Sequence, residues 1–508
     1  MSRPGPPRPS AAVVPKSQET PDTIRRNALV SFASQMTTAA FTAVLTLFLV
    51  RRLGPHGFGL FSLALSLGAL AALPSDAGIT GSAARFIAEN RGHRAAVAAV
   101  LADALKLKAA TSLVVSLALA GFAGLIAAAY SEPGLVWPLR GIALAVFGQG
   151  IVLLFAQTFV ARGKAVSNLP LFFWESAVET GASVCLVLLG GGATGAAFGR
   201  GIGYLFGASV GLVMAVRLLG STVLRAPISG SGIRRIGSYA GSLAVIEGAW
   251  ILFGRMDTLL LGAFLGAVSV GIYQAPRSLT GFLNYPGLAI ANGIAPRLAY
   301  TREEGPKVDA LLAGIRLLLI LYGALAAPLL VWAGPIVDVV LGPSYGDSAK
   351  VLRALAPAVV LSGLAPLLTM SVAYLGQAPR RIPIGLGTLV IGFALDFVLI
   401  RTIGVVGAAI GTSVALAFYV AGHFWICRSI LSFPFRPTIL TALRAGAASI
   451  AMASVLLASG DSDLSVAQWI LGSLAGTCAF AAVLVVTREV TRTELARARS
   501  LVARRLLG

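Results

Sequence analysis

LGPHGFGLFSLALSLGALAALPSDAGITGSAAR, residues 53–85, has a second copy at residues 265–297, LGAVSVGIYQAPRSLTGFLNYPGLAIANGIAPR, 212 positions later and without a gap. Ten of the 33 paired positions are identical. The same offset recurs downstream, so one register is held over a long stretch of chain. That register predicts an internal duplication, which decides how the rest of the sequence is interpreted. The identical pairs include Gly54 with Gly266, Gly59 with Gly271, Pro74 with Pro286, Gly199 with Gly411 and Gly192 with Gly404.

Composition identifies the kind of chain that was duplicated. Hydrophobic residues make up 57% of the 508 positions and charged residues only 12%, against about 25% charged in soluble domains. Mean hydropathy is +0.85. A transmembrane helix needs about 20 mostly apolar residues, and we count fourteen such stretches between residues 27 and 487. We therefore predict an all-α integral membrane protein with about fourteen transmembrane helices.

The positive charges predict an orientation. With the N-terminus in the cytoplasm, 30 of the 40 lysines and arginines fall on cytoplasmic segments and 5 on external loops. This bias is expected for an even number of helices with both termini inside. The net charge of +20 then reflects orientation and contact with anionic lipid heads, so we expect no nucleic acid partner.

The period of the duplication predicts the domain organisation. A 212-residue offset covers six apolar stretches, so the second copy enters the membrane from the same side as the first. Two parallel six-helix lobes follow, an arrangement that transporters use to place a substrate site near the midplane between repeats. The predicted parts are a disordered cytoplasmic leader (1–26), a first lobe (27–217), a cytoplasmic linker (218–235), a second lobe (236–429), two appended helices (430–487) and a basic cytoplasmic tail (488–508).

Pro74 and Pro286 occupy equivalent positions in the two copies. Proline lacks the backbone N–H and kinks a helix, so both lobes are expected to bend at matching depth. The pair is either a shared hinge or an inherited kink with no part in gating.

Charged residues inside the predicted spans are the candidates for a functional site. Each costs at least about 2.5–3.5 kcal/mol at the bilayer centre, so such a charge usually faces a partner or a wet cavity. Glu175 and Glu179 are four residues apart and share one face of a helix. Some of these charges are expected to form structural ion pairs only, with Arg255 and Asp257, near a helix end, the first candidates. The full set comprises Asp76, Glu175, Glu179, Glu247, Asp257, Asp396, Arg200, Arg255, Arg277 and Arg316.

Signatures of enzymes and metal sites are missing from the sequence. There is no GxxxxGK[ST], HExxH or CxxC pattern, and the three histidines are scattered. Cys185, Cys427 and Cys478 fall in predicted spans without metal spacing. We therefore expect no catalytic residues, no metal and no cofactor.

Several short motifs, in order, resemble one known family. They are residues 52–61 (RLGPHGFGLF), 75–78 (SDAG), 257–262 (DTLLLG), 270–273 (VGIY) and 341–345 (LGPSY). From about Arg25 to Arg428 the chain is similar to the polysaccharide biosynthesis, or O-antigen-type oligosaccharide, flippases of the multidrug/oligosaccharidyl-lipid/polysaccharide exporter superfamily. The resemblance implies two six-helix lobes in a V and alternating access. It also implies translocation of undecaprenyl-diphosphate-linked oligosaccharides to the outer leaflet of a bacterial inner membrane.

The intramembrane charges suit such a substrate. Guanidinium groups offer bidentate donors to phosphate oxygens, so we place Arg200, Arg277 and Arg316 around the diphosphate. Glu175, Glu179 and Glu247 are expected to accept sugar hydroxyls or carry a coupling proton. Asp76, Arg255, Asp257 and Asp396 are coupling or structural charges.

Two other functions stay open at this point. A drug or cation antiporter of the same superfamily would favour an acidic cavity without arginines. A membrane-embedded ligase or transferase would convert the lipid-linked sugar rather than move it. Expected partners are the lipid-linked oligosaccharide, membrane lipids, a polysaccharide polymerase and glycosyltransferases.

Overall fold

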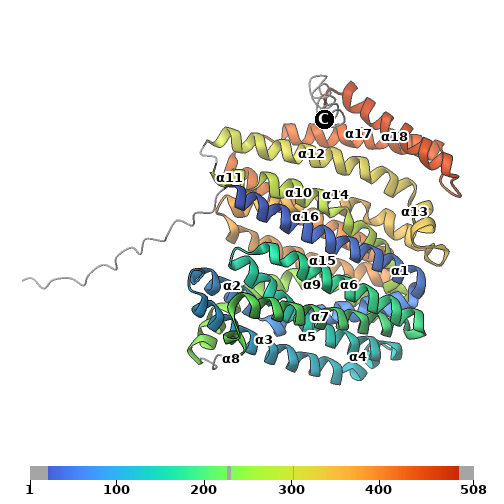
Figure 1. The fold of residues 1–508 in the computed structure, drawn as a ribbon. Helices are drawn as coiled ribbons and strands as arrows, with labels where there is room; N and C mark the ends of the chain where they lie inside the picture. The colour runs from blue at the N-terminus through green and yellow to red at the C-terminus, as the bar shows by residue number, and fades with distance from the viewer. Residues whose placement is uncertain (1–20, 226–229, 301–302, 491–508) are drawn as a thin grey trace, which may run out of the picture.

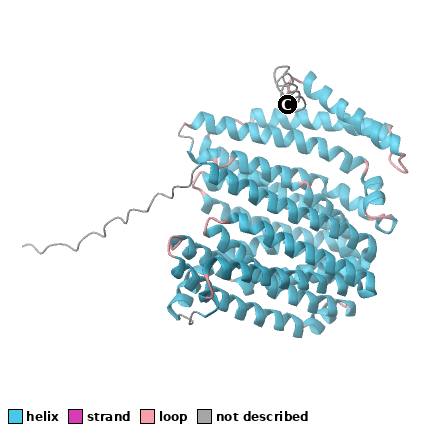
Figure 2. Ribbon diagram, in the orientation of Figure 1, coloured by secondary structure: helices cyan, strands magenta, loops and turns pink. Residues whose placement is uncertain are grey.

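A computed structural model describes residues 21–225, 230–300 and 303–490, and all regular structure in these ranges is helical (Figure 2). The first half contains α1 (Pro21–Asp76), α2 (Ile79–Glu89), α3 (Arg94–Gly121), α4 (Ala123–Ala129), α5 (Val136–Ala161), α6 (Asn168–Leu186), α7 (Gly192–Leu219) and α8 (Thr222–Arg225). The second half contains α9 (Gly230–Phe282), α10 (Asn284–Ile294), α11 (Arg297–Tyr300), α12 (Glu304–Val331), α13 (Ala333–Val340), α14 (Ser348–Tyr374), α15 (Arg381–Ile403), α16 (Val405–Leu431), α17 (Arg436–Ala458) and α18 (Val466–Val486).

The duplication is visible in the backbone of α1 and α9. Each helix runs through two predicted spans and is interrupted once, at Gly54 (φ 66°, ψ 178°) and at Gly266 (φ 78°, ψ −179°). A side chain rarely tolerates positive φ, so glycine is needed at both breaks. The two glycines are paired by the 212-residue offset, and so the repeated sequence produces a repeated kink.

Eleven helices in the described ranges are long and apolar enough to cross a membrane. Three of these segments, Ala33–Asp76, Ala165–Leu219 and Ile251–Ala299, are 44, 55 and 49 residues long, about twice the length that one crossing needs. Each contains a break at one or more positive-φ glycines, namely Gly54, Gly190 with Gly192, and Gly266. The number fourteen stays a prediction, and these long segments leave room for it.

Helix packing divides the molecule into neighbouring groups (Figure 1). Helix α1 packs on α3, α5, α6 and α7, whereas α9 packs on α14, α15 and α16. The two groups meet mainly where α1 contacts α9. Helices α17 and α18 lie beyond α12 at one edge, where the indole of Trp332 donates to the Gly460 carbonyl at 2.9 Å and packs edge-on against Trp469.

The predicted segment boundaries differ in detail from the helices. Residues 21–26, predicted as part of the leader, already belong to α1, and α9 begins at Gly230 rather than at 236. The rest of the leader and the tail beyond residue 490 lie outside the described residues.

The helix breaks near Pro74 and Pro286 are not at matching positions. Pro74 lies in the last turn of α1, and the break follows at Ala77 (φ 41°) and Gly78 (φ 80°). In the second copy the break precedes the proline, because α9 ends at Phe282 and Pro286 lies in the first turn of α10. The first turn of a helix accepts proline without losing a hydrogen bond, and only the first copy has the Gly78 that allows the later break. A common hinge stays a prediction.

Candidate functional site

A charged cluster lies between α6 and α7 in the first lobe. The Arg200 guanidinium donates to Glu179 Oε1 at 2.5 Å and to the Tyr204 hydroxyl at 3.1 Å. Glu175, one turn from Glu179, accepts from Ser176 at 3.1 Å. Both glutamates are buried. The cluster brings together three of the residues predicted for the site, Glu175, Glu179 and Arg200.

A row of glycines on α7 lets α6 approach closely enough to form this cluster. Four glycines, each four residues after the last, lie on one face of α7. A Cβ added to any of them would overlap a neighbouring helix. Small residues at this spacing are typical of close helix contacts in membranes, so the spacing of these glycines is a sequence signal for the contact between α6 and α7. The glycines and the residues they face are Gly199 with Ser183, Gly203 with Glu179, Gly207 with Glu175 and Gly211 with Phe155.

A second charged cluster lies in the other lobe, where α9, α15 and α16 meet. Arg277 forms an ion pair with Asp257 and donates to the Tyr273 hydroxyl at 3.0 Å. Tyr273 in turn donates to Asp257 Oδ2 at 2.5 Å, and the Thr412 hydroxyl lies 3.4 Å from the same oxygen. Asp257 is only 2% exposed. Asp257 therefore orients Arg277 through an ion pair and a shared tyrosine.

Asp396 of α15 belongs to the second cluster but is bonded differently. It is 2% exposed, and its Oδ1 has no hydrogen-bond partner among the described residues. A Cβ at Gly411 of α16 would overlap that oxygen. Asp396 also interacts electrostatically with Arg277, so it is a second carboxyl group near the arginine.

The two clusters occupy related places in the two repeats. Arg200 and Thr412 are separated by the 212-residue offset, as are Gly199 and Gly411. Gly199 is the contact of α7 with α6, and Gly411 is the contact of α16 with α15. Each lobe therefore holds an arginine and two carboxyl groups around equivalent helix pairs. The two arginines are not equivalent in the repeat, because Arg200 corresponds to Thr412 and not to Arg277.

Asp76 pairs with a lysine that is not among the predicted site residues. Lys108 of α3, whose side chain is 2% exposed, forms an ion pair with Asp76 at the end of α1. The Thr80 hydroxyl donates to the same carboxylate oxygen at 2.5 Å. In the sequence Lys108 stands at the start of an apolar stretch, where a lysine is typical of a cytoplasmic flank. Its spacing of 32 residues from Asp76 gave no local signal.

Arg316 lies apart from both clusters. Its Nε donates to Glu489 Oε1 at 2.9 Å, just after α18, and Glu489 also accepts from Arg444 at 2.8 Å and from Thr441 at 2.8 Å. Burial acts to raise the pKa of Glu489, but hydrogen bonds from Arg444, Thr441 and Arg316 outweigh it and hold that pKa below its ordinary value. The structure therefore joins Arg316 to the appended helices.

Arg255 and Glu247 both lie on α9. Arg255 is half-buried and forms no hydrogen bond or ion pair with any residue whose side chain is described. The Glu247 side chain lies outside the described residues. The same described part of the chain brings no three His, Cys, Asp or Glu side chains into a metal-binding group.

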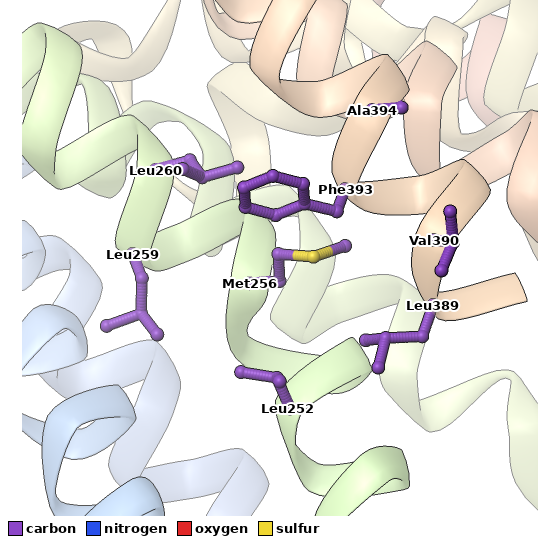
Figure 3. Close-up of a pocket in the computed structure, with 8 residues that line it drawn as sticks. All are labelled: Leu252, Met256, Leu259, Leu260, Leu389, Val390, Phe393 and Ala394. Carbon is purple, nitrogen blue, oxygen red and sulfur yellow. The ribbon is translucent and has the colours of Figure 1, made fainter. Parts of the chain in front are cut away.

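An apolar pocket of about 500 Å³ opens between α9 and α15 (Figure 3). Met256 reaches toward the ring of Phe393 across it. Leu252 and Val390 at its sides are exposed. The lining residues are Leu252, Met256, Leu259, Leu260, Leu389, Val390, Phe393 and Ala394.

Hydrogen bonds close the two lobes together at the end that holds Gly54 and Gly266. Burial raises the pKa of Tyr345, so its hydroxyl stays protonated and able to donate. Four bonds between described residues cross between the lobes here. The Ala267 N–H donates to Glu132 Oε1 at 2.7 Å, the Tyr345 hydroxyl donates to the Val50 carbonyl at 3.1 Å, and Arg51 donates from Nε to the Val340 carbonyl at 3.0 Å and from its other donor to the Val339 carbonyl.

Two repeated helical lobes, an apolar exposed surface and charged clusters inside each lobe define a polytopic membrane protein. The chain belongs to the polysaccharide biosynthesis protein family, whose model matches residues 24–299. It is 22% identical over 416 residues to the probable low-salt glycan biosynthesis flippase Agl15 of Haloferax volcanii. The match covers 81% of this chain and 85% of Agl15.

Solved structures show the same fold. The inward closed conformation of the lipid II flippase MurJ matches with a TM-score of 0.70 and 12% identity, over 92% of this chain and 99% of that one. An inward-facing multidrug resistance MATE family transporter matches with a TM-score of 0.64 and 15% identity, over 80% and 98%. The resemblance to polysaccharide flippases of this exporter superfamily is thereby confirmed.

Proposed function

We propose that this protein moves undecaprenyl-diphosphate-linked oligosaccharides from the cytoplasmic to the outer leaflet of a bacterial inner membrane. Both termini lie in the cytoplasm in this proposal, as the positive charges predict. The protein acts as a transporter and not as an enzyme. Glycosyltransferases supply the substrate and a polysaccharide polymerase uses it.

The observation that carries the proposal is the pair of arginine clusters. Arg200 in one lobe and Arg277 in the other are each fixed by a buried carboxylate and a tyrosine. A guanidinium has five N–H donors, so a held arginine retains donors for phosphate oxygens. One positive group from each lobe suits an anionic diphosphate better than it suits a cationic drug.

The closed end of the molecule fits entry from the cytoplasm. If the predicted orientation holds, the Glu132, Tyr345 and Arg51 bonds close the external end. A substrate would then enter from the cytoplasmic leaflet and leave only after these bonds break. The Gly54 and Gly266 breaks lie beside these contacts, where α1 and α9 can change direction. Gly190 and Gly192 break the third long segment.

Reconstitution tests the function directly. Proteoliposomes containing the purified protein are loaded with a fluorescent undecaprenyl-diphosphate oligosaccharide, and an impermeant lectin reports its arrival in the other leaflet. We expect protein-dependent transfer of chemically unchanged lipid. Transfer no faster than in protein-free liposomes would refute the proposal, and a shortened or lengthened glycan would indicate a transferase. Transfer of a lipophilic cation instead would favour the antiporter.

A further inference from the structure

Arg401, in the last turn of α15, packs against two aromatic rings. Its guanidinium carbon lies 4.3 Å from the ring centroid of Phe264 and 4.0 Å from that of Phe397. The two rings meet edge to face, with their centroids 5.6 Å apart. Arg401 is exposed and forms no hydrogen bond or ion pair with any described residue. The rings therefore hold the guanidinium group in place, while its five N–H donors have no protein acceptor.

The two rings connect Arg401 to the apolar pocket between α9 and α15 (Figure 3). Phe264 follows the pocket residue Leu260 by one turn of α9. Phe397 follows the pocket residue Phe393 by one turn of α15, and their ring centroids are 6.0 Å apart. Residues one turn apart lie on the same face of a helix. The eight pocket residues, Phe264, Phe397 and Arg401 thus form one groove, here named the α9–α15 groove, which is apolar along its length and positive at one end.

The length of the α9–α15 groove matches one leaflet of a membrane. Arg401 follows Val390 by 11 residues in α15, and a rise of 1.5 Å per residue separates them by about 16 Å. Half of the hydrocarbon core of a bilayer is about 15 Å thick. When Val390 lies near the middle of the bilayer, Arg401 therefore lies at the level of the lipid headgroups.

Little protein covers the apolar face of α15. Its main neighbours among the described helices are α9 and α16 of the same lobe. Leu386, Val390 and Phe393 are exposed. An apolar surface of a membrane-spanning helix that no protein covers is as compatible with hydrocarbon as a leucine is, so a lipid chain can occupy the groove without displacing protein.

The positive, aromatic end of the groove has no counterpart in the first repeat. The 212-residue offset pairs Arg401 with Leu189 and Phe397 with Cys185. Neither residue of the first repeat provides a cation or an aromatic ring. A contact that only stabilised the shared helix pair would be expected in both repeats. Arg401 and Phe397 therefore serve something particular to the second lobe.

We propose that the α9–α15 groove binds an anionic phospholipid of the bilayer, with an acyl chain in the apolar pocket and the phosphate on Arg401. A phosphate oxygen accepts charge-assisted hydrogen bonds from a guanidinium group. A choline headgroup brings its own cation, which Arg401 repels, so a lipid with net negative charge binds more tightly. In the predicted orientation this lipid belongs to the outer leaflet. The site is separate from the transport of a lipid-linked sugar, so its test does not depend on the proposed function.

The test measures lipid binding to the full-length protein in detergent by native mass spectrometry. The probes are phosphatidylglycerol, which is anionic, and phosphatidylcholine with the same acyl chains. The variants are Arg401→Ala, Arg401→Lys and Ala394→Trp, which fills the pocket. The control is Arg140→Ala, because Arg140 is also exposed and packs against one ring, that of Trp137, at 4.6 Å, but lies outside the groove.

Arg401→Ala should weaken phosphatidylglycerol binding about fivefold, the effect of losing one basic residue beside a charged headgroup. Binding of phosphatidylcholine should change little. Arg401→Lys keeps the charge but loses the planar fork, so its affinity should lie in between. Ala394→Trp should weaken both lipids alike, because it blocks the acyl chain. Arg140→Ala should bind both lipids like the unchanged protein.

Photolabelling locates the bound chain. Phosphatidylglycerol with a photoreactive group in the middle of an acyl chain should label peptides of α9 and α15, and Ala394→Trp should reduce this labelling. Equal phosphatidylglycerol affinity in Arg401→Ala and the unchanged protein would overturn the inference, as would labelling confined to α17 and α18. Displacement of phosphatidylglycerol by equimolar undecaprenyl phosphate would assign the groove to a polyprenyl lipid and overturn it as well. None of these outcomes bears on whether the protein transfers a lipid-linked sugar.

Discussion

Gly59 and Gly271 face each other's repeat across the crossing of α1 and α9. A Cβ at Gly59 would overlap the carbonyl oxygen of Ala267, and a Cβ at Gly271 would overlap that of Pro55. Pro55 and Ala267 are themselves separated by 212 residues. The contact of Gly59 with Ala267 is therefore repeated, 212 residues on, as the contact of Gly271 with Pro55. The two contacts are related by a pseudo-twofold axis that passes between them.

Valine at Gly59 or Gly271 should force the two helices apart. Overpacking costs about 1–3 kcal/mol in ordinary cores, and here the obstacle is backbone, which yields less easily. We expect both variants to lower the melting temperature and to impair lipid transfer. The two effects should be similar in size because the two sites are related by the repeat. The double variant should be less than additive, since both changes disturb one contact.

Gly181→Val is the matched control for that experiment. Gly181 lies in α6, and a Cβ there would meet nothing within 4 Å. Its melting temperature should change little. Normal stability and transfer in Gly59→Val would contradict the close crossing.

Arg277→Ala should destabilise the protein as well as block transport. Asp257 would be left buried and unpaired, and breaking a buried ion pair by removing one partner costs about 3–5 kcal/mol. Arg277→Ala with Asp257→Asn removes both charges and should recover much of the melting temperature while transport stays low. Transport restored together with stability would mean that the pair is only structural.

The sequence predicted local features of the site better than long-range partners. The repeat, the helical class and the sharing of a face by Glu175 and Glu179 follow from spacing alone. The pairing of Asp76 with Lys108 and of Arg316 with Glu489 depends on how distant helices pack, which spacing does not encode. The different breaks beside Pro74 and Pro286 show a further limit, because one additional glycine, Gly78, moves the break to the other side of the proline.

The Glu489 cluster should make stability depend on acidity. The pKa of Glu489 is lowered from 4.5 in the folded protein, so its contribution is present above that value and is lost as pH falls through the folded pKa. The melting temperature should therefore fall more between pH 5 and roughly pH 3 in the unchanged protein than in Glu489→Gln. Parallel curves for the two proteins would contradict this assignment.

Reporter fusions test the predicted orientation. Fusions after Ser344, which lies between α13 and α14, and after Ser462, between α17 and α18, should give an external signal. Fusions after Arg162, between α5 and α6, should give a cytoplasmic one. A cytoplasmic signal at Ser344 would overturn both the helix count and the parallel arrangement of the repeats.

Crosslinking tests whether the closed end opens during transport. Arg51, in the first lobe, bonds the carbonyls of Val339 and Val340 in the second, and Val339 is 58% exposed. In a background with Cys185, Cys427 and Cys478 replaced by alanine, a cleavable thiol crosslinker should join Arg51→Cys to Val339→Cys. A protease site inserted between α8 and α9 shows the link on a gel as two halves that stay together. Arg51→Cys with Val466→Cys, at the start of α18, is the control pair and should not crosslink.

Joining Arg51→Cys to Val339→Cys should stop lipid transfer, and cleaving the linker should restore it, because the substrate leaves only when these contacts separate. Full transfer by the crosslinked protein would show that the substrate crosses without opening this end.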